Sequence, residues 1–406
     1  MRVMFTVSSW ATHYASMVPL GWALQSLGHE VRVLCPPTQA GPVAAAGLLP
    51  VPVLDGMDIV TANRLQYYQE AVDGHWPNPW LPLHPINGQR MASLADFDVA
   101  AYRRDVEPEF VTREARSYDA AVDIARRWRP DVVVHDPTSL EGLLAAKVTG
   151  VPAVLSLWGP VGTHEPEHMR IVPPDRSDSF PRYGLGEFTL DQIDHVLDPC
   201  PAAVAPPVTA ERIPVRYVPY NGSGEVPAWL FDPPERRRVC VVWSTALSLM
   251  SGPDTFRLPE LVHALAGLDA EIVVAAIGAD LAALGTPPPG VRLVDRLPLR
   301  LLLPTCAASV HPGGSGNTMT SMWAGVPQLA VTFISETTAA ARRLAASGAG
   351  RHLPAPAAAP EIVRAEVAAL LDDPVHRERA GHLRDEITLR PTTADVVDVL
   401  DKLAQT

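Results

Sequence analysis

One glycine-rich segment of the sequence has the composition of a phosphate-binding loop. It follows an apolar run that ends at Val310 and it reads His311-Pro312-Gly313-Gly314-Ser315-Gly316-Asn317-Thr318. Glycines let the backbone approach a ligand closely, and the free N–H groups at the start of a helix bind anions. The serine, asparagine and threonine side chains add further donors. We therefore expect a cradle for a diphosphate that lacks the P-loop lysine, although a plain glycine turn leading into a helix has the same pattern.

His13 is the second residue suited to chemistry, because it lies in the polar loop that follows the apolar run Val3–Val7. A histidine accepts a proton near neutral pH, and an alcohol that attacks a sugar must lose its proton to a base. Asp136 ends a later apolar run, where a carboxylate could hold the second imidazole nitrogen. A helix cap before Pro137 explains Asp136 equally well.

These residues belong to a chain that alternates strands and helices. Residues 3–34 follow the pattern strand, helix, strand, which requires a parallel sheet and a right-handed crossover. The alternation recurs over residues 115–155 and restarts at Arg238. Open parallel sheets bind ligands at the carboxyl ends of their strands, and two such sheets can enclose a cleft. The predicted fold class is therefore α/β, with two doubly wound Rossmann-like domains.

The length of 406 residues suggests two domains, and a proline-rich segment divides them. We expect an N-terminal domain over residues 1–205, a linker over 206–235 and a C-terminal domain over 236–406. The sequence leaves open whether the last helix returns to the first domain.

Composition and absent motifs exclude several classes of protein. The net charge of −12 argues against a nucleic-acid partner, and no run of about 20 apolar residues could span a membrane. The first strand–helix turn, residues 8–16, has no glycine, which argues against NAD or FAD at that position. The cysteines have no zinc-type spacing, and we expect neither a metal nor a cofactor. The expected location is cytoplasmic.

Two long proline-rich stretches, residues 74–85 and 159–186, interrupt the first half. Such loops are often binding loops, and surface insertion is the alternative. The phosphate-binding pattern lies in the second half, so the remaining wall of a cleft would bind the partner substrate. We expect a small hydrophobic acceptor to contact apolar side chains of these stretches: Trp76, Trp80, Leu83, Trp158 and Met169.

Taken together, these motifs resemble the GT-B glycosyltransferases that decorate natural products in actinomycetes. Over nearly the whole chain the pattern is similar to that of macrolide, spinosyn and anthracycline enzymes. The segments that carry the resemblance are His13 with Met17-Val18-Pro19-Leu20, Gly28-His29-Glu30-Val31, Tyr217–Gly224 and Leu302–Cys306 with His311–Gly316. The resemblance implies transfer of a deoxysugar from a TDP-sugar to a hydroxyl group of a polyketide, with inversion and without a metal.

The resemblance also implies roles for individual residues. His13 matches the catalytic base, and Asp136 is similar in placement to its supporting carboxylate. His311 matches a histidine that contacts the diphosphate. Leu297 matches the position whose backbone reads the nucleobase. The other positions that match the donor site are Ser244, Thr245, Gly313, Gly314, Ser315, Gly316 and Asn317.

The sequence departs from the family pattern in three places, which involve four residues. Pro312 replaces a second histidine, and Arg296 replaces an aromatic residue, where its guanidinium plane could stack on the base. Glu336-Thr337 replaces an Asp-Gln pair that holds sugar hydroxyls. Two other functions stay open: a nucleotide-sugar 2-epimerase on the same fold, and a non-catalytic partner subunit. The sequence does not decide whether the chain forms a homodimer or requires an auxiliary activator protein.

Overall fold

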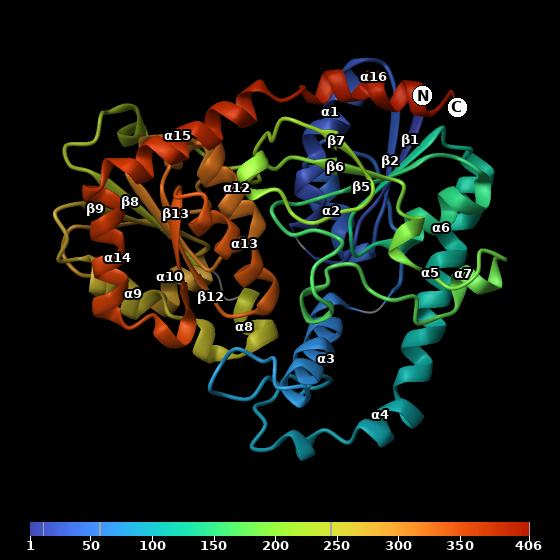
Figure 1. Cartoon of the computed structure of the whole chain (residues 1–406), viewed down its shortest axis with the longest axis horizontal. Coiled ribbons are helices and arrows are strands. Elements are labelled where there is room, and N and C mark those ends of the chain that lie inside the picture. Colours follow the sequence, from blue (N-terminus) through green and yellow to red (C-terminus); the bar gives the residue numbers. More distant parts are fainter. Residues whose placement is uncertain (11, 57, 244–245, 406) are drawn as a thin grey trace.

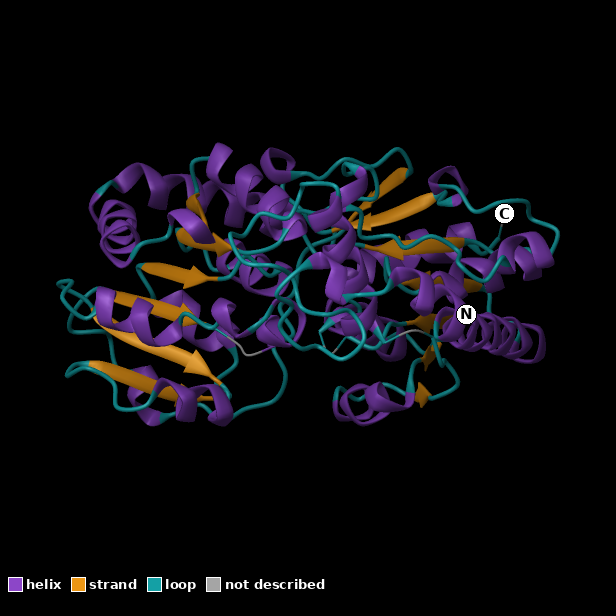
Figure 2. Cartoon of the chain, turned by 90° about the horizontal axis from the view of Figure 1, so that it is seen from below, coloured by secondary structure: helices purple, strands orange, loops and turns teal. Residues whose placement is uncertain are grey.

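The chain folds into two α/β units that face one another, in a computed structural model that describes residues 1–10, 12–56, 58–243 and 246–405. Figures 1 and 2 show one parallel sheet in each unit, with helices on both faces of the sheet. Two doubly wound parallel sheets, one in each unit, agree with the fold class predicted from the sequence.

The first sheet has seven parallel strands in the order β3-β2-β1-β4-β5-β6-β7. Its strands are β1 (Arg2–Thr6), β2 (Glu30–Leu34), β3 (Pro50–Val51), β4 (Val132–His135), β5 (Ala153–Ser156), β6 (His195–Asp198) and β7 (Glu211–Pro214). The helices of this unit are α1 (Val18–Ser26), α2 (Pro37–Ala45), α3 (Ile59–Val72), α4 (Val99–Asp105), α5 (Glu107–Trp128), α6 (Leu140–Thr149) and α7 (Ser179–Arg182). The central strands β1, β4 and β5 are almost wholly buried, which explains their near-continuous apolar runs.

The second sheet has six parallel strands in the order β10-β9-β8-β11-β12-β13. Its strands are β8 (Arg238–Val242), β9 (Glu271–Ala276), β10 (Val291–Asp295), β11 (Ala308–His311), β12 (Gln328–Thr332) and β13 (Gly350–Pro354). The helices that follow residue 245 are α8 (Ala246–Ser251), α9 (Leu258–Leu265), α10 (Gly278–Leu284), α11 (Leu299–Leu302), α12 (Ser315–Trp323), α13 (Ser335–Ala346), α14 (Pro360–Asp372), α15 (Pro374–Leu389) and α16 (Thr393–Leu403). Among the described helices, none is long and apolar enough to cross a membrane.

The first sheet extends further along the chain than the sequence boundary at residue 205 implies. Strand β7 lies inside the segment 206–235 assigned to the linker, and it pairs with β6 from His195↔Glu211 to Asp198↔Pro214. A proline at a strand end on the edge of a sheet needs no ladder partner for its missing N–H group. The connection between the two sheets therefore spans residues 215–237.

The last helix, α16, lies on the first unit, next to α1, so that both chain termini are near each other (Figure 1). Val396, Val397 and Leu400 are buried in the same apolar cluster as β1 and α1. The chain therefore crosses between the two units twice, and α16 ties its end to the first sheet.

Helix α3 makes a further link between the units. It packs against α8 of the second unit, and the Arg64 guanidinium donates to the Leu249 carbonyl at 2.8 Å. In the loop after α3, Asn78 donates to the Phe333 carbonyl at 2.7 Å. Helix α3 and this loop thus reach from the first sheet to the second, below the space between the sheets in Figure 1.

We expect Leu400→Ala to lower the melting temperature, because it opens a cavity under a wholly buried side chain. Such substitutions typically cost about 2–5 kcal/mol. Leu389→Ala is the matched control, since Leu389 on α15 is 85% exposed and should change little. Differential scanning calorimetry of both variants makes the comparison. Equal melting temperatures would mean that the packing of α16 on α1 contributes no stability.

Candidate active site between the two sheets

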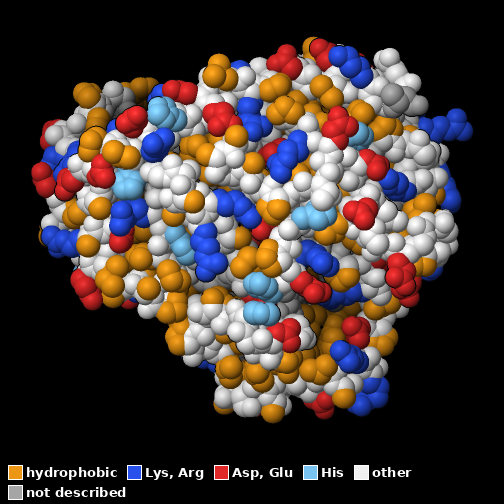
Figure 3. Space-filling view, in the orientation of Figure 1, with side chains coloured by type: hydrophobic (Ala, Val, Ile, Leu, Met, Phe, Trp, Pro, Cys, Tyr) orange, Lys and Arg blue, Asp and Glu red, His pale blue; other side chains and the backbone are white. Residues whose placement is uncertain are grey.

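A cavity of about 1680 Å³ lies between the two units and is lined by residues of both. The first unit contributes the loop after β1 and one side of α3. The second contributes the start of α12 and the start of α13. Figure 3 shows the surface hollowed between the lobe that carries α3 and α4 and the body of the first unit, with hydrophobic side chains along the hollow.

The glycine-rich segment forms one wall of this cavity at the N-terminus of α12. The residues of the segment that line the cavity are Pro312, Gly314, Ser315, Gly316 and Asn317. A helix start presents unpaired N–H groups and a positive dipole end, and this arrangement binds anions such as phosphate.

Gly313 and Gly314 have different physical roles in this wall. Gly313 has φ +85°, and a Cβ there would lie 2.9 Å from the Thr332 side chain, so its role is to shape the turn. Gly314 has φ −59°, and a Cβ there would meet only the Asn317 amide at 4.0 Å. A side chain at Gly314 would therefore leave the fold intact and enter the space above the helix start.

His311 lies outside the cavity, contrary to its expected contact with a diphosphate. The ring is wholly buried, its Nδ1 accepts from the Gly313 N–H at 3.0 Å, and its Nε2 lies 2.7 Å from Gln328 Oε1. Burial lowers the pKa of His311 to about 4. The neutral His311 ring, with both nitrogens hydrogen-bonded, supports the glycine-rich turn from the side away from the cavity. The next residue, Pro312, is the one that lines the cavity.

Of the other residues expected to bind the donor sugar nucleotide, some line the cavity and others face the solvent. Leu297 lines the cavity. Arg296 does not: its side chain is 77% exposed and lies near Asp295, so the structure does not place its guanidinium over a nucleobase. Ser244 and Thr245 fall outside the described residues.

His13 lines the cavity from the opposite unit, in the short helical turn after β1. Its ring stacks on Trp158, with centroids 3.8 Å apart. Its Nδ1 lies 2.8 Å from Ser8 Oγ and 3.3 Å from Thr138 Oγ1. Among the described residues none bonds to Nε2, so this nitrogen is left for a ligand in the cavity.

The hydroxyl of Thr138 fixes which imidazole nitrogen carries the proton. Thr138 Oγ1 donates its single proton to Asp136 Oδ1 at 2.7 Å, so toward His13 it can only accept. We therefore assign the proton of neutral His13 to Nδ1, which leaves a lone pair on Nε2. This is the tautomer that a base facing the cavity requires.

Asp136 supports His13 through this hydroxyl rather than by a direct bond, which corrects the contact expected from the sequence. Its buried carboxylate accepts from the Ser8 N–H at 2.6 Å and from the Thr138 N–H at 2.7 Å. Asp136 therefore both caps the turn before α6 and supports the base, His13. Burial lowers the pKa of His13 to about 4, and the negative charge of Asp136 opposes this shift.

Three of the expected acceptor residues belong to the contact between the units instead of the cavity. Trp76 and Trp80 pack against the apolar cluster of the second sheet, and the Trp76 indole donates to the Trp80 carbonyl at 2.6 Å. Leu83 is buried and lies beside Gly252. At these positions the stretch 74–85 therefore attaches α3 to the second unit, which is neither the expected acceptor contact nor the alternative of a surface insertion.

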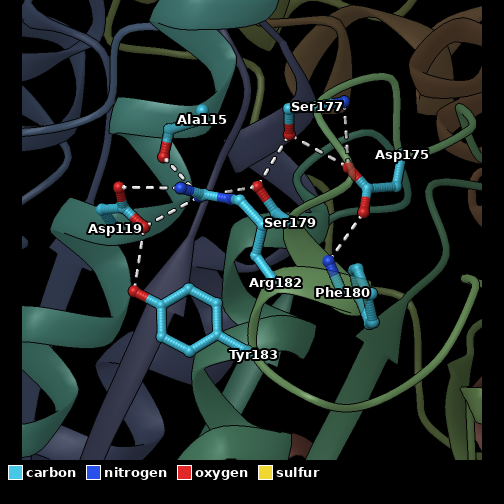
Figure 4. A network of polar contacts seen from close by, with 8 residues as sticks. All are labelled: Ala115, Asp119, Asp175, Ser177, Ser179, Phe180, Arg182 and Tyr183. Atoms are coloured by element: carbon cyan, nitrogen blue, oxygen red, sulfur yellow. Dashed lines mark hydrogen bonds and ion pairs between the residues drawn. The ribbon is translucent and has the colours of Figure 1, made fainter.

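The second stretch, residues 159–186, has two parts: residues 167, 168, 170–174 and 176 line the cavity, and the far end is structural. Trp158, which precedes it, lines the cavity, but Met169 does not. At its far end Figure 4 shows the side chains turned toward α5: the Tyr183 hydroxyl donates to Asp119 at 2.9 Å, and Arg182 pairs with the same carboxylate. Phe180 is wholly buried. These aromatic side chains hold the loop to the domain.

The apolar part of the cavity wall comes partly from α3 and α4, which the sequence did not predict, and partly from the stretch 159–186, where an acceptor contact was expected. It combines side chains of α3, of α4 and its preceding loop, and of the segment 171–174: Leu65, Tyr68, Phe97, Val99, Tyr102, Ile171 and Val172. The N-cap of α3 was a usable signal, because the Asp58 side chain accepts from the Thr61 N–H.

Two carboxylates face the second unit's end of the cavity. Glu336, with Thr337, lines the cavity in the first turn of α13, as expected. Glu70 of α3 was not predicted, and it accepts from the Ser335 hydroxyl at 2.8 Å across the domain contact. Burial raises the pKa of both Glu336 and Glu70 to about 7. Within the described ranges, no group of three or more His, Cys, Asp and Glu residues could hold a metal.

The comparisons with known proteins agree with this geometry. The N-terminal domain model of the family described as erythromycin biosynthesis protein CIII-like matches residues 22–244, and the C-terminal domain model matches residues 259–403. The chain is 33% identical to the 3-alpha-mycarosylerythronolide B desosaminyl transferase of Saccharopolyspora erythraea, over 100% of this chain and 98% of the relative. It is 34% identical to the 10-deoxymethynolide desosaminyltransferase of Streptomyces venezuelae, over 100% and 97%.

Solved structures show the same architecture over the full length. The spinosyn rhamnosyltransferase complexed with thymidine diphosphate aligns with a TM-score of 0.77 at 29% identity, covering 99% of this chain and 100% of that one. The same enzyme complexed with the spinosyn aglycone aligns with a TM-score of 0.75 at 30% identity, with the same coverage. The chain is therefore a GT-B glycosyltransferase and belongs to the erythromycin biosynthesis protein CIII-like family of actinomycete natural-product enzymes.

Proposed function

We propose that the chain transfers a deoxysugar from a TDP-sugar to a hydroxyl group of a polyketide, with inversion at the anomeric carbon. The observation that carries this proposal is the placement of His13 and the start of α12 on facing walls of one cavity. A base and an anion site that face each other suit a displacement in which an oxygen attacks as a diphosphate leaves.

The reaction would proceed in one step. The acceptor oxygen attacks the anomeric carbon while His13 Nε2 takes its proton, and the bond between that carbon and the diphosphate oxygen breaks. TDP leaves with the electron pair, and the N–H groups at the start of α12 stabilise its charge. Because a single displacement occurs, the configuration inverts. We expect the reaction to need no metal, and undiminished turnover in EDTA is the check.

The relatives support transfer over the two rival functions. Those described above are named as transferases, and one solved relative, the spinosyn rhamnosyltransferase, was determined in complex with thymidine diphosphate and in complex with its aglycone. Incubation with a TDP-sugar panel, with and without polyketide aglycones, tests the proposal by mass spectrometry. Glycosylated aglycone supports it, whereas an isomerised donor in the absence of aglycone would identify an epimerase.

We expect Gly314→Val to weaken TDP binding by at least tenfold, because the branched side chain enters the space above the α12 amides. Gly381→Val is the matched control: its added Cβ would meet nothing within 4 Å, so it is as free of steric conflict as at Gly314, but the residue lies on α15, away from the cavity. Calorimetric titration with TDP measures both. Equal TDP affinity in the two variants would mean that the diphosphate does not bind at the start of α12.

We expect His13→Ala to reduce kcat by about 10²–10⁴-fold, the usual contribution of a general base. TDP affinity should stay within about twofold, because His13 and the α12 start lie on opposite walls. Steady-state kinetics at saturating donor and acceptor give the answer. A variant that kept half of the normal rate would exclude His13 as the base.

Thr138 provides a finer test of the same assignment. Thr138→Val keeps the shape and removes the hydroxyl that accepts from Nδ1, so the imidazolium formed during transfer loses one partner. We expect kcat to fall by roughly tenfold, since a hydrogen bond to a charged group contributes about 1.5–3 kcal/mol and Ser8 remains. Thr138→Ser should restore most of the rate. If valine and serine behaved alike, the hydroxyl would have no part in orienting the base.

We expect Leu65→Ala to raise the acceptor KM by roughly tenfold, the discrimination that small changes give in an apolar pocket. The donor KM should not change. Trp80→Ala is the contrasting variant, and it should lower the melting temperature without a selective effect on the acceptor. If Trp80→Ala raised only the acceptor KM and left the melting temperature unchanged, Trp80 would belong to the acceptor site after all.

A further inference from the structure

Trp158 forms the aromatic face against which the proposed base lies. The Trp158 and His13 rings are stacked, with their centroids 3.8 Å apart and their planes inclined by 23°. Trp10 also approaches His13, but its ring centroid is 6.4 Å away and the two planes differ by 54°, so these rings are not stacked. The indole of Trp158 is therefore in a position to control how the imidazole lies.

The stack restrains a motion of the His13 ring that its hydrogen bonds leave free. Ser8 and Thr138 both lie at Nδ1, on one edge of the ring. Bonds at one edge allow the ring to swing about that edge, whereas a second ring against its face fixes its plane. With the plane fixed, Nε2 keeps its direction toward the cavity.

The indole N–H of Trp158 has no hydrogen bond with any described residue. The residue is 8% exposed, and this nitrogen is buried without a partner in the part of the chain that the structure describes. A buried N–H group without a partner costs free energy, and buried tryptophans usually have one. The ring is therefore held by contacts of its faces and by the loop that carries it, and one of those faces lies on His13.

The second unit holds the loop that carries Trp158. The Arg343 guanidinium on α13 donates to the Pro160 carbonyl at 2.8 Å and pairs with the Glu165 carboxylate at 2.7 Å. The carboxylate of Glu165 is 2% exposed, and it also accepts from the Gly162 N–H at 3.0 Å. One cation of the second unit thus fixes two points of this loop of the first unit.

Gly159 brings the same loop against the start of α12. A Cβ on Gly159 would lie 3.1 Å from the Cβ of Ser315, so the absence of a side chain allows this close approach. Ser315 is the first residue of α12, where we place the diphosphate in the proposed reaction. Trp158 therefore lies between the base and the proposed diphosphate site, in a loop whose place the second unit determines.

We propose that Trp158 is a positioning residue for the base: its ring fixes the plane of the imidazole and stabilises the imidazolium, and Arg343 holds that ring across the domain contact. A cation over the face of a tryptophan, within about 6 Å of the ring centroid, is attracted by the ring quadrupole. This attraction grows when His13 becomes charged, so it favours the state in which the proton has moved. The inference rests on the proposed transfer with His13 as its base.

The first test removes the aromatic face and then restores it. Trp158→Leu fills part of the space without a π face, and Trp158→Phe keeps such a face. We expect kcat to fall by about tenfold in the leucine variant and to recover largely in the phenylalanine variant, with TDP affinity within about twofold in both. The acceptor KM should change less than kcat. Trp128→Leu is the matched control, because the Trp128 ring lies against the Arg32 guanidinium at 4.8 Å, away from the cavity, and kcat should stay normal.

A pH profile separates this role from simple exclusion of water. Burial lowers the pKa of His13 to about 4, and the charge of Asp136, which opposes this shift, is the same in both Trp158 variants. If Trp158 only kept water out, Trp158→Leu would let the pKa of His13 return toward its ordinary value of 6.5. An acidic limb of kcat/KM at that pH would overturn the inference. We expect instead a lower plateau without a limb between about pH 5 and 8.

A double-mutant cycle tests the link to the second unit. Arg343→Lys keeps a positive charge beside Glu165 but loses the planar fork that also reaches the Pro160 carbonyl. We expect this change to lower kcat by about threefold or more in the normal protein and to have no further effect in Trp158→Leu, because both changes remove the same contact. Arg342→Lys, at the neighbouring exposed position of α13, is the matched control and should keep the normal kcat.

Three further outcomes would overturn the inference. A normal kcat in Trp158→Leu, or equal losses in the leucine and phenylalanine variants, would exclude a role for the aromatic face. A rise of the acceptor KM alone would make Trp158 an acceptor contact only. Additive losses from Arg343→Lys and Trp158→Leu would mean that Arg343 does not act through this ring. In each case His13→Ala would still lower kcat as the proposed function requires, whereas normal turnover in His13→Ala would contradict both.

Discussion

The site depends on the contact between α3 with its following loop and the second domain. Each sheet alone presents one half of the chemistry: a base after β1, or an anion site at the start of α12. The base and the anion site can act on the same ligands only at a fixed separation. Helix α3 sets this separation through two of its residues: Arg64 bonds to α8, and Glu70 bonds to α13. The loop residue Asn78 adds a bond to the carbonyl of Phe333. Because these contacts also form the cavity wall, any change in the domain arrangement alters the site directly.

Hydrogen-bond direction, more than proximity, determines what His13 can do. Asp136 is an acceptor only, so it takes the Thr138 proton and leaves Thr138 as an acceptor toward Nδ1. The lone pair of the imidazole therefore faces the cavity. The same burial that lowers the pKa of His13 to about 4 makes it a weak base at rest. The negative charge of Asp136 offsets part of the cost of charging the buried His13 ring. This support matters when the ring takes up a proton during transfer.

Local signals in the sequence were sufficient for the central strands of both sheets, for the turn after β11 and for the position of His13, but not for β7, which lay in the predicted linker. The apolar run that ends at Val310 forms β11 in the structure, because buried parallel strands have continuous apolar runs. Helix α3 was missed, since its buried residues, such as Tyr67 and Glu70, pack on a distant part of the chain and leave no plain 3.6-residue apolar stripe. The prediction that Trp76 and Trp80 contact the acceptor was wrong for the same reason: both side chains pack on the apolar core of the other domain.

The cavity separates residues that maintain the fold from residues that select the ligand. His311 and Gly313 keep the family pattern and lie behind the wall, where they shape the turn through bonds to Gln328 and a positive φ. Pro312 and Glu336 depart from that pattern, and both line the cavity. A departure at a buried position would strain the turn, whereas a departure on the wall changes only what the cavity binds. Divergence of such enzymes toward new sugars should therefore concentrate on lining positions, including those that α3 supplies from the opposite domain.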